Sequence, residues 1–280
     1  MAAGTLYLVA TPIGNLEDVT LRALRVLRET PHLYAEDTRR TRTLLARHGI
    51  AARVRSLHAH NEAARAEEIV ALLARGEDAA LVSDAGTPLV SDPGERTAAA
   101  AAAAGYRVCP VPGPSAVLAA LAGSGLPAIP FVFAGFVPRK AGERRARLAE
   151  LAARAEAVVL FESPQRLAAT LAELAAAFGA ARRACVAREL TKLHETFERG
   201  ALGELAERFA DGTRGEVTIV IEGAPPPAAP DVAELASALR AALAAGQSAR
   251  DAARELAAAY GVPRREAYAL ALSIRSGAGR

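Results

Sequence analysis

Ionisable side chains gather in two short segments of this 280-residue chain. Glu36 and Asp37 are adjacent in the segment AEDTRRT, and the segment ARELTKLHE carries Glu189, Lys192 and His194. A carboxylate, an amine or an imidazole can remove a proton from a reacting group or stabilise the charge that develops on it. These five side chains are therefore candidates for acid–base chemistry, and the residue types alone do not choose among them.

Both segments also have a structural interpretation. Asp37 precedes an Arg-rich helical pattern and can act as its N-cap, while Lys192 can form an ion pair with Glu189 or Glu195. Only two of the 34 basic residues are lysines, Lys140 and Lys192. A surface position in so Arg-biased a chain would tend to become Arg, so Lys192 indicates a role that needs a compact ammonium. We select Lys192, Glu189 and Asp37 as catalytic candidates.

Three loops rich in Gly and Pro could bind a ligand: ATPIGN (residues 10–15), SDAGTPLVSDPG (83–94) and PVPGPSA (110–116). Glycine lets the backbone approach a ligand closely, proline stiffens the loop, and hydroxyl and N–H groups bind polar edges. Any one of these loops alone could be an ordinary tight turn. None contains GKS, GKT or GxGxxG, which disfavours ATP hydrolysis and ordinary dinucleotide binding.

The elements that must position these loops alternate between strand and helix. TLYLVA, HLYA and RVRSL predict strands, as do runs inside DAALVSDAG and YRVCPVPGPSA. Between them, helical patterns begin at Leu16, cover residues 62–76 and end at Gly105. This alternation predicts a parallel sheet with crossover helices. In such a sheet the three loops meet at the carboxyl ends of the strands, where ligands bind.

A second α/β block follows SGLPAIP (residues 124–130), whose turn formers predict a domain boundary. FVFAGF, AVVLFE, RRACVAREL, ETFERG and GEVTIVIEG predict strands that lie close in sequence, which favours a mixed sheet. In FESPQRL, Ser163 suits a helix N-cap and Pro164 the first helical position. That leaves Phe161 and Glu162 free to face a cleft.

The last part of the chain is helical in pattern. EGAPPPAAP (residues 222–230) predicts a stiff linker, and helices are expected over residues 231–245, 248–260 and 263–276. The predicted fold class is therefore α/β. Its predicted domains are a parallel α/β domain over residues 1–126, a second α/β domain with a mixed sheet over residues 127–224, and a helical region over residues 231–280.

The composition is that of a folded, mildly basic chain, with 51% hydrophobic residues, 23% charged residues and a net charge of +3. This charge is compatible with an RNA or phosphate partner. RKAGERRAR is the densest basic stretch, and it either contacts RNA phosphates or forms a solvated helix start. The RNA-binding candidates are Arg139, Lys140, Arg144, Arg145 and Arg147.

The remaining features point to a reducing compartment. Cys109 and Cys185 stand apart in apolar surroundings, which indicates reduced thiols. The N-terminal segment lacks a basic region, and no stretch of about 18 apolar residues occurs. His58 and His60 have no carboxylate at a metal-ligand spacing. We expect a soluble, cytoplasmic protein without a membrane segment or a metal.

The motifs, taken together, resemble those of one family. They occur in its order: ATPIGNLEDVTLRAL, AEDTRRTRTLL, SDAGTPLVSDPG, PGPSA, SGLP, FESPQRL and ARELTKLHE. From Gly4 to about Ser276, the chain resembles the bacterial 16S ribosomal RNA (cytidine-2′-O)-methyltransferases, which belong to the tetrapyrrole-methylase-like (class III) group of S-adenosylmethionine enzymes. Two departures, Gln165 where His is common and Thr196 where an acid is common, concern local substrate contacts.

The resemblance implies two α/β domains that bind S-adenosylmethionine in the cleft between them, and a homodimer. The implied substrate is one cytidine in the decoding region of 16S rRNA, within the small ribosomal subunit, and the chemistry needs no metal. The residues implied to touch the cofactor are Pro12, Gly14, Asn15, Asp84, Ala85, Gly86, Thr87, Pro88, Gly113, Pro114, Ser115, Phe161, Glu162 and Ser163.

Two other functions stay open from the sequence. A relative of the same fold could methylate a tetrapyrrole or another small molecule, although the C-terminal helices, with Arg264 and Arg265, and the basic stretch favour a larger, anionic substrate. The chain could also be a non-catalytic RNA-binding or ribosome-assembly protein that retains the fold.

Overall fold

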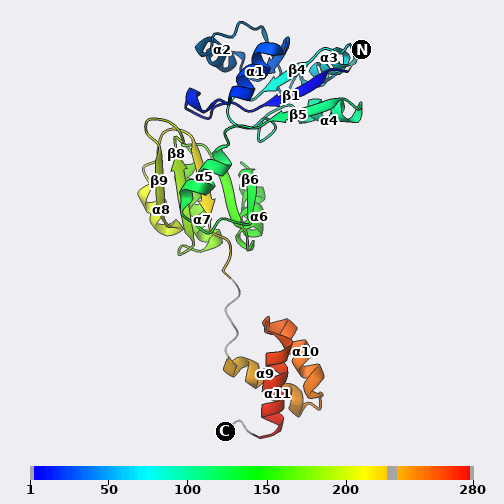
Figure 1. Cartoon of the computed structure of the whole chain (residues 1–280). Coiled ribbons are helices and arrows are strands. Elements are labelled where there is room, and N and C mark those ends of the chain that lie inside the picture. Colours follow the sequence, from blue (N-terminus) through cyan, green and yellow to red (C-terminus); the bar gives the residue numbers. More distant parts are fainter. Residues whose placement is uncertain (1–2, 226–231, 278–280) are drawn as a thin grey trace. The chain divides into compact units, whose positions relative to one another are not determined.

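The computed structural model describes residues 3–225 and 232–277. The chain divides into two compact units, residues 1–223 and residues 224–280, which are described one at a time (Figure 1). The first unit holds both sheets, and the second is helical. No helix in the described ranges is both long and apolar enough to cross a membrane.

A five-stranded parallel sheet forms the first half of the larger unit, as predicted. Its strands run in the order β3-β2-β4-β1-β5, and every pairing is parallel. The central strand β4 is buried along its whole length, as expected for a sheet that is covered on both faces. The strand bounds are β1 (Thr5–Val9), β2 (His32–Ala35), β3 (Val54–Ser56), β4 (Ala79–Val82) and β5 (Arg107–Val111).

Helices cover both faces of this sheet. Helices α1 and α2 bury Leu27 and Leu44 on one face, and α3 and α4 bury Ile69 and Ala101 on the other. Each of these residues lies on the apolar side of its helix, which explains why the helices dock there. The helix bounds are α1 (Leu21–Glu29), α2 (Thr38–Arg47), α3 (Glu62–Ala74) and α4 (Glu95–Ala103).

The chain differs from the prediction at the start of the first helix. The pattern predicted a helix from Leu16, but Leu16–Asp18 is a separate 3₁₀ turn, η1, and α1 begins only at Leu21. Asn15 caps the turn and Thr20 caps α1, each by accepting a backbone N–H two or three residues ahead. Two caps so close together start two helices and force a bend between them.

A mixed five-stranded sheet forms the second half of the larger unit. Its order is β6-β7-β10-β8-β9, with β6 and β7 parallel and the other pairs antiparallel. This confirms the predicted mixed sheet. The strand bounds are β6 (Phe131–Phe136), β7 (Ala157–Glu162), β8 (Arg183–Arg188), β9 (Thr196–Ala201) and β10 (Val217–Ile221).

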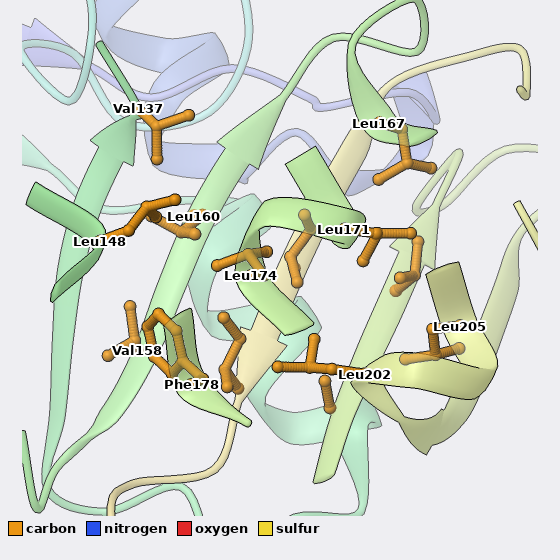
Figure 2. Packing of buried hydrophobic residues seen from close by; sticks show 14 of the residues in the cluster. Val137, Leu148, Val158, Leu160, Leu167, Leu171, Leu174, Phe178, Leu202 and Leu205 are labelled. Carbon is orange, nitrogen blue, oxygen red and sulfur yellow. The ribbon is translucent and has the colours of Figure 1, made fainter. Parts of the chain in front are cut away.

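Three helices pack their leucines on one face of this mixed sheet (Figure 2). They are α6 (Ala141–Ala152), α7 (Leu167–Phe178) and α8 (Leu202–Arg208). Leu171 and Leu174 of α7 point toward Val158 and Leu160 of β7, and all four are fully or almost fully buried. This is the main hydrophobic core of the second half.

The helix α5 (Ala116–Ser124) packs differently from the sequence prediction. The predicted boundary at residue 126 placed it in the first domain, but Val117 and Ala120 pack against Val159, Cys185 and Val220 of the second sheet. The sheet face opposite α7 is apolar, and α5 is the helix that covers it. The two predicted α/β domains therefore share a hydrophobic cluster and form one compact unit.

The smaller unit is a three-helix bundle with a core made mostly of alanine. The predicted helices are confirmed as α9 (Val232–Ala244), α10 (Ala249–Tyr260) and α11 (Arg264–Arg275). Ser248 caps α10, and Gly261, at φ +65°, ends it in the left-handed conformation typical of a C-terminal glycine. Residues 226–231, which hold most of the predicted linker and the predicted first helical residue, lie outside the described residues.

Candidate functional site

Backbone strain is concentrated in two loops of the larger unit. Among the described residues, the non-glycine residues with positive φ are Leu89, Ser91, Glu189 and Thr191. The first two belong to SDAGTPLVSDPG, which follows β4, and the other two belong to ARELTKLHE, which follows β8. Residues other than glycine rarely have a positive φ. Such residues recur where a binding site requires a fixed loop shape. The two loops are thus the first candidates for a site.

The loop after β4 is tied to the loop after β1. Thr11 and Gly86 exchange two backbone hydrogen bonds of 3.0 Å, and the Thr11 hydroxyl donates to the Ser83 carbonyl at 2.9 Å. Gly86 has φ +79°, and a Cβ there would lie 3.3 Å from Ile13. The conformation favours glycine, so this position keeps the backbone open to a ligand.

The loop after β1 also contacts the ARELTKLHE segment from the second sheet. The backbone N–H of Asn15 donates to the Thr191 hydroxyl at 3.0 Å. A Cβ at Gly14 would lie 2.5 Å from Lys192 Cγ and 2.9 Å from the Leu190 carbonyl oxygen. Only a glycine allows this approach, and it brings Lys192 to the carboxyl edge of the first sheet.

Lys192 lies between two carboxylates. Its ammonium donates to Glu189 at 2.9 Å and to Glu216 at 3.0 Å. Burial lowers the pKa of Lys192, but these two hydrogen bonds outweigh burial, so the pKa is raised. The hydrogen bond from Lys192 lowers the pKa of Glu189, and the Glu216 backbone N–H lowers it further. The predicted ion pair with Glu189 is present, and Lys192 is a stable cation and a poor base.

The carboxylate of Asp37 caps a helix, as the structural interpretation of its segment predicted. It caps α2 by accepting from the Arg39 backbone amide at 2.9 Å, and it forms an ion pair with the Arg39 guanidinium. The hydrogen bond from the Arg39 side chain holds the pKa of Asp37 well below its usual value. The Asp37 carboxylate is therefore already engaged as a cap and in an ion pair, and its selection as a catalytic candidate stays a prediction.

The neighbouring Glu36 has the opposite property. Burial raises the pKa of Glu36, and the nearby carboxylates of Asp84 and Asp92 raise it further. Asp92 itself accepts a hydrogen bond from the Ser83 hydroxyl at 2.5 Å. Burial also raises the pKa of Asp92, so Glu36 and Asp92 are the two carboxylates at this edge that take up a proton more readily than an ordinary one. His194 is exposed, and it forms no hydrogen bond or ion pair with the residues that the structure describes.

A cavity of about 650 Å³, here called the larger cavity, lies at this edge. Gly86 and the start of α5 at Ser115 line it from one side, and Phe136 and Phe161 line it from the second sheet. The two aromatic rings meet edge to face, with centroids 5.8 Å apart. A helix start offers N–H groups to an anion, and aromatic rings offer an apolar wall to a flat ring system.

The larger cavity gathers most of the residues expected to touch the cofactor: Asp84, Ala85, Gly86, Thr87, Ser115, Phe161, Glu162 and Ser163. Glu36 and Asp37 also line it. Pro88 lines a much smaller hollow, which Glu36 also lines. Asn15, Gly113 and Pro114 line neither of these two spaces and support the loops instead. A Cβ at Gly113, for example, would lie 2.9 Å from the Ala10 Cβ.

The expectation that Glu162 faces the cleft freely is wrong for its carboxylate. The side chain is 1% exposed, and it accepts from the Thr170 hydroxyl and the Ser163 amide, each at 2.7 Å. It also lies 3.4 Å from the Arg166 guanidinium. These bonds tie the end of β7 to the start of α7, so its carboxylate is structural, whereas Phe161 does face the cavity.

A second cavity of about 330 Å³, here called the smaller cavity, adjoins the first. Pro12 and Gly14, expected to touch the cofactor, line this cavity instead. Lys192 and Glu216 line it from the second sheet. Sequence reasoning missed Glu216, because it stands at the start of an otherwise apolar strand and no motif marks it.

The basic stretch at residues 139–147 is largely paired. Arg144 forms a bidentate ion pair with Glu173 of α7. Lys140 pairs with Glu143 at 3.1 Å, and Arg147 with Glu150 at 2.6 Å. Within the described residues, only Arg139 and Arg145 of this stretch are exposed without a side-chain ion pair or hydrogen bond.

The described residues contain no group of three or more His, Cys, Asp or Glu side chains arranged to hold a metal ion. Cys185 is fully buried, and burial raises the pKa of its thiol to about 11. This thiol is therefore unreactive at neutral pH.

The sequence of the chain matches those of known proteins. Residues 5–206 match the family model of the Tetrapyrrole (Corrin/Porphyrin) Methylases. The chain is 50% identical over 234 residues to the ribosomal RNA small subunit methyltransferase I of Xylella fastidiosa, covering 82% of this chain and 86% of that protein. It is 44% identical over 276 residues to the protein of the same name from Synechocystis sp., covering 98% and 99% of the two chains.

Solved structures share the fold at lower identity. The uroporphyrin-III C-methyltransferase of Thermus thermophilus, in complex with S-adenosylhomocysteine, aligns at a TM-score of 0.55 and 22% identity over 78% of this chain and 97% of that chain. A diphthine synthase aligns at a TM-score of 0.60 and 17% identity over 78% and 90%. The family model, the nearly full-length relative and the shared fold lead to one conclusion: the chain belongs to the tetrapyrrole methylase family and, within it, to the ribosomal RNA small subunit methyltransferase I family.

Proposed function

We propose that the chain transfers a methyl group from S-adenosylmethionine to the ribose 2′-hydroxyl of a cytidine in the decoding region of 16S rRNA. The observation that carries this proposal is the nearly full-length similarity to a ribosomal RNA small subunit methyltransferase I. The assignment of the cytidine 2′-oxygen as the acceptor rests on the sequence motifs, which resemble those of the (cytidine-2′-O)-methyltransferases. The proposed partners are the small ribosomal subunit and a second copy of the chain.

The larger cavity is the proposed cofactor site. The start of α5 at Ser115 suits the methionine carboxylate, and Phe136 and Phe161 suit the adenine ring. Gly86 leaves room for the ligand along the loop. The structural neighbour in complex with S-adenosylhomocysteine supports S-adenosylmethionine as the methyl donor. When bound, the cofactor supplies an electrophilic methyl group on a sulfonium.

Lys192 is proposed to stabilise the acceptor oxygen. The 2′-oxygen develops negative charge as its proton leaves, and an ammonium held beside it lowers the energy of that state. Because its pKa is raised, Lys192 stays protonated at neutral pH and acts as a cation. Glu189 is a positioning residue, since its Oε1 accepts a hydrogen bond from the Lys192 ammonium at 2.9 Å.

Glu36 is proposed to accept the proton from the 2′-hydroxyl. The new bond joins the 2′-oxygen to the methyl carbon while the bond between that carbon and the sulfonium sulfur breaks, and the hydroxyl proton passes to the Glu36 carboxylate. Glu36 lines the larger cavity and has a raised pKa, so it binds a proton more readily than Asp37 does. Most of the remaining rate comes from holding the two reactants in line.

A labelled-methyl assay tests this proposal. The chain is incubated with S-adenosylmethionine that carries a labelled methyl group, together with unmethylated small subunits in one reaction and uroporphyrinogen in another. We expect label in 16S rRNA and none in the tetrapyrrole. Label in the tetrapyrrole would favour the small-molecule alternative, and a failure to bind S-adenosylmethionine by calorimetry would favour a non-catalytic assembly protein.

A further inference from the structure

The helices on the two faces of the first sheet differ in charge. Helices α1 and α2, which share a hydrophobic cluster on one face, carry the basic residues Arg22, Arg25, Arg28, Arg39, Arg40, Arg42 and Arg47 against a single acidic residue, Glu29. Helices α3 and α4, on the other face, carry four glutamates and two arginines. The whole chain has a net charge of only +3, so the positive charge on α1 and α2 is a local excess that the rest of the chain offsets.

Four of these arginines have free side chains. They are exposed and form no side-chain hydrogen bond or ion pair with the residues that the structure describes: Arg28, Arg40, Arg42 and Arg47. The other three donate within the chain, as Arg25 does to Glu29 at 3.2 Å. No acidic residue stands three or four positions from Arg42 or Arg47, which is the spacing at which a helix forms ion pairs. We call these four arginines the α1–α2 basic face.

The first turn of α2 is unfavourable for the helix by itself. Arg39 and Arg40 lie in this turn, and no acidic residue does. The N-terminal end of a helix carries a partial positive charge, so anions stabilise it and cations destabilise it. Asp37 caps the turn and pairs with Arg39, whereas Arg40 forms no ion pair in the described part of the chain. An anion bound at Arg40 would offset this cost.

Arg40 also connects the basic face to the site, because it lines both the larger and the smaller cavity. From there α2 runs for ten residues, a length of about 15 Å. Arg47, at the far end of the helix, is displaced from Arg40 by about 10 Å along the helix axis. Free guanidinium groups therefore extend from the cavities to the far end of α2, so an extended polyanion can contact several of them at once.

Two arguments favour RNA as the partner of this face. The guanidinium group binds phosphate through a fork of donors, and four free arginines offer more such contacts than the basic stretch at residues 139–147, which is largely paired. A second copy of the chain fits poorly, because a twofold contact brings the same patch of both copies together and would oppose like charges.

We propose that the α1–α2 basic face is an RNA-docking surface, which binds phosphates of 16S rRNA beside the cavities. This inference rests on the proposed function, and it adds the face of the chain that lies against the small subunit. The contribution of this face is electrostatic, so it should depend strongly on salt and little on the base sequence.

The experiment removes three charges and keeps the helices. The variant Arg28→Gln/Arg42→Gln/Arg47→Gln retains Arg40, which lines the proposed cofactor site, and glutamine has nearly the helix propensity of arginine. Binding to small subunits and to protein-free 16S rRNA is measured over a range of salt concentrations. We expect binding on the order of 100-fold weaker at about 0.1 M salt, and a slope of log K against log salt that is smaller by about 2–3. The Tm and the calorimetric affinity for S-adenosylmethionine should stay at their wild-type values.

The matched control removes the same charge elsewhere on the larger unit. Arg96→Gln/Arg107→Gln/Arg183→Gln changes three exposed arginines, one on α4 and the others at the starts of β5 and β8. It should keep the wild-type affinity and salt slope. An equal loss in this control would show that net charge matters and the α1–α2 basic face does not, which would overturn the proposal.

The remaining outcomes identify the partner. A wild-type salt slope in the α1–α2 variant would overturn the docking surface and leave the proposed function standing. A loss of binding to small subunits but not to protein-free rRNA would assign the face to a ribosomal protein, and a changed mass in sedimentation would assign it to a second copy of the chain; either result refutes RNA docking. If the wild type binds rRNA through this face but transfers no methyl group to it, the proposed function fails and the docking surface stands.

Discussion

Lys192 and Glu36 both have raised pKa values, with different consequences for their charge at neutral pH. The raised pKa keeps Lys192 positive between Glu189 and Glu216, and it makes Glu36 a better proton acceptor than an ordinary exposed carboxylate. The two side chains therefore have separate proposed roles in the chemistry. The ammonium stabilises charge on the acceptor oxygen, and the carboxylate takes its proton.

The Lys192→Arg substitution tests the first of these roles. It keeps the positive charge but spreads it over a planar guanidinium, so the contact with the acceptor oxygen changes. We expect single-turnover methylation to fall at least about tenfold, roughly 1.4 kcal/mol of barrier, with RNA and cofactor affinities preserved. Lys140→Arg alters an exposed lysine that directly precedes α6 and should have no effect. A wild-type rate in Lys192→Arg would leave this lysine with a purely structural role.

The pH profile of Glu36→Gln tests the second role. A general base works only when deprotonated, so the wild-type single-turnover rate should rise with pH through the raised pKa of Glu36 and then level off. Glu36→Gln should lower the rate and remove this inflection. Asp37→Asn, whose carboxylate serves α2, should keep the inflection. An unchanged profile in Glu36→Gln would assign the proton to another acceptor.

Contacts between the loops that follow the strands position these residues. The loop after β1 fits against the ARELTKLHE segment because Gly14 has no side chain. This contact holds the lysine from the second sheet beside the loops of the first sheet, although the two segments are far apart in sequence.

Gly14→Ala tests this contact. Its Cβ would lie 2.9 Å from the Leu190 carbonyl oxygen, and backbone atoms move at a cost of about 1–3 kcal/mol in a packed site. We expect a lower Tm and a clear loss of methyl transfer. Gly142→Ala, where a Cβ would meet nothing within 4 Å, is the control and should retain full activity. Equal activity in the two variants would contradict the proposed role of the contact.

The basic stretch on α6 yields a prediction that separates RNA contacts from structural ones. Replacing Arg139 and Arg145 with Ser should weaken RNA binding and reduce the slope of log K against log salt by about 0.7–0.9 for each phosphate contact that is lost. Arg144→Ser should instead lower the Tm, because Arg144 is bound to Glu173. If Arg144→Ser changes the salt slope and the double variant does not, the assignment is reversed.

The elements were largely predictable because their signals are local. Apolar runs between Gly- and Pro-rich loops identify the strands, and the spacing of helices between strands identifies the parallel sheet. The packing of α5 was not predictable, because its apolar face would suit either sheet and only the assembled fold shows which face is uncovered. The separate start of α1 depends on two caps that compete within a few residues.

The site was predictable in its loops more than in its side chains. Gly86 and the residues around it follow from the loop composition, and most of them line the larger cavity. The carboxylate of Glu162 was misjudged because its partner, Thr170, lies a helical turn into α7, where no motif marks it. Glu216 was missed for the same reason, since its importance depends on Lys192, which is distant in sequence.

At the scale of the whole molecule, the proposed function is the methylation of the 2′-oxygen of a cytidine in 16S rRNA. The most direct measurement is nucleoside analysis by mass spectrometry of 16S rRNA from unmethylated small subunits, after incubation with the full chain and S-adenosylmethionine. We predict one new 2′-O-methylcytidine per subunit, located in the decoding region. A methyl group on a base, on another nucleoside or nowhere in the RNA would contradict it.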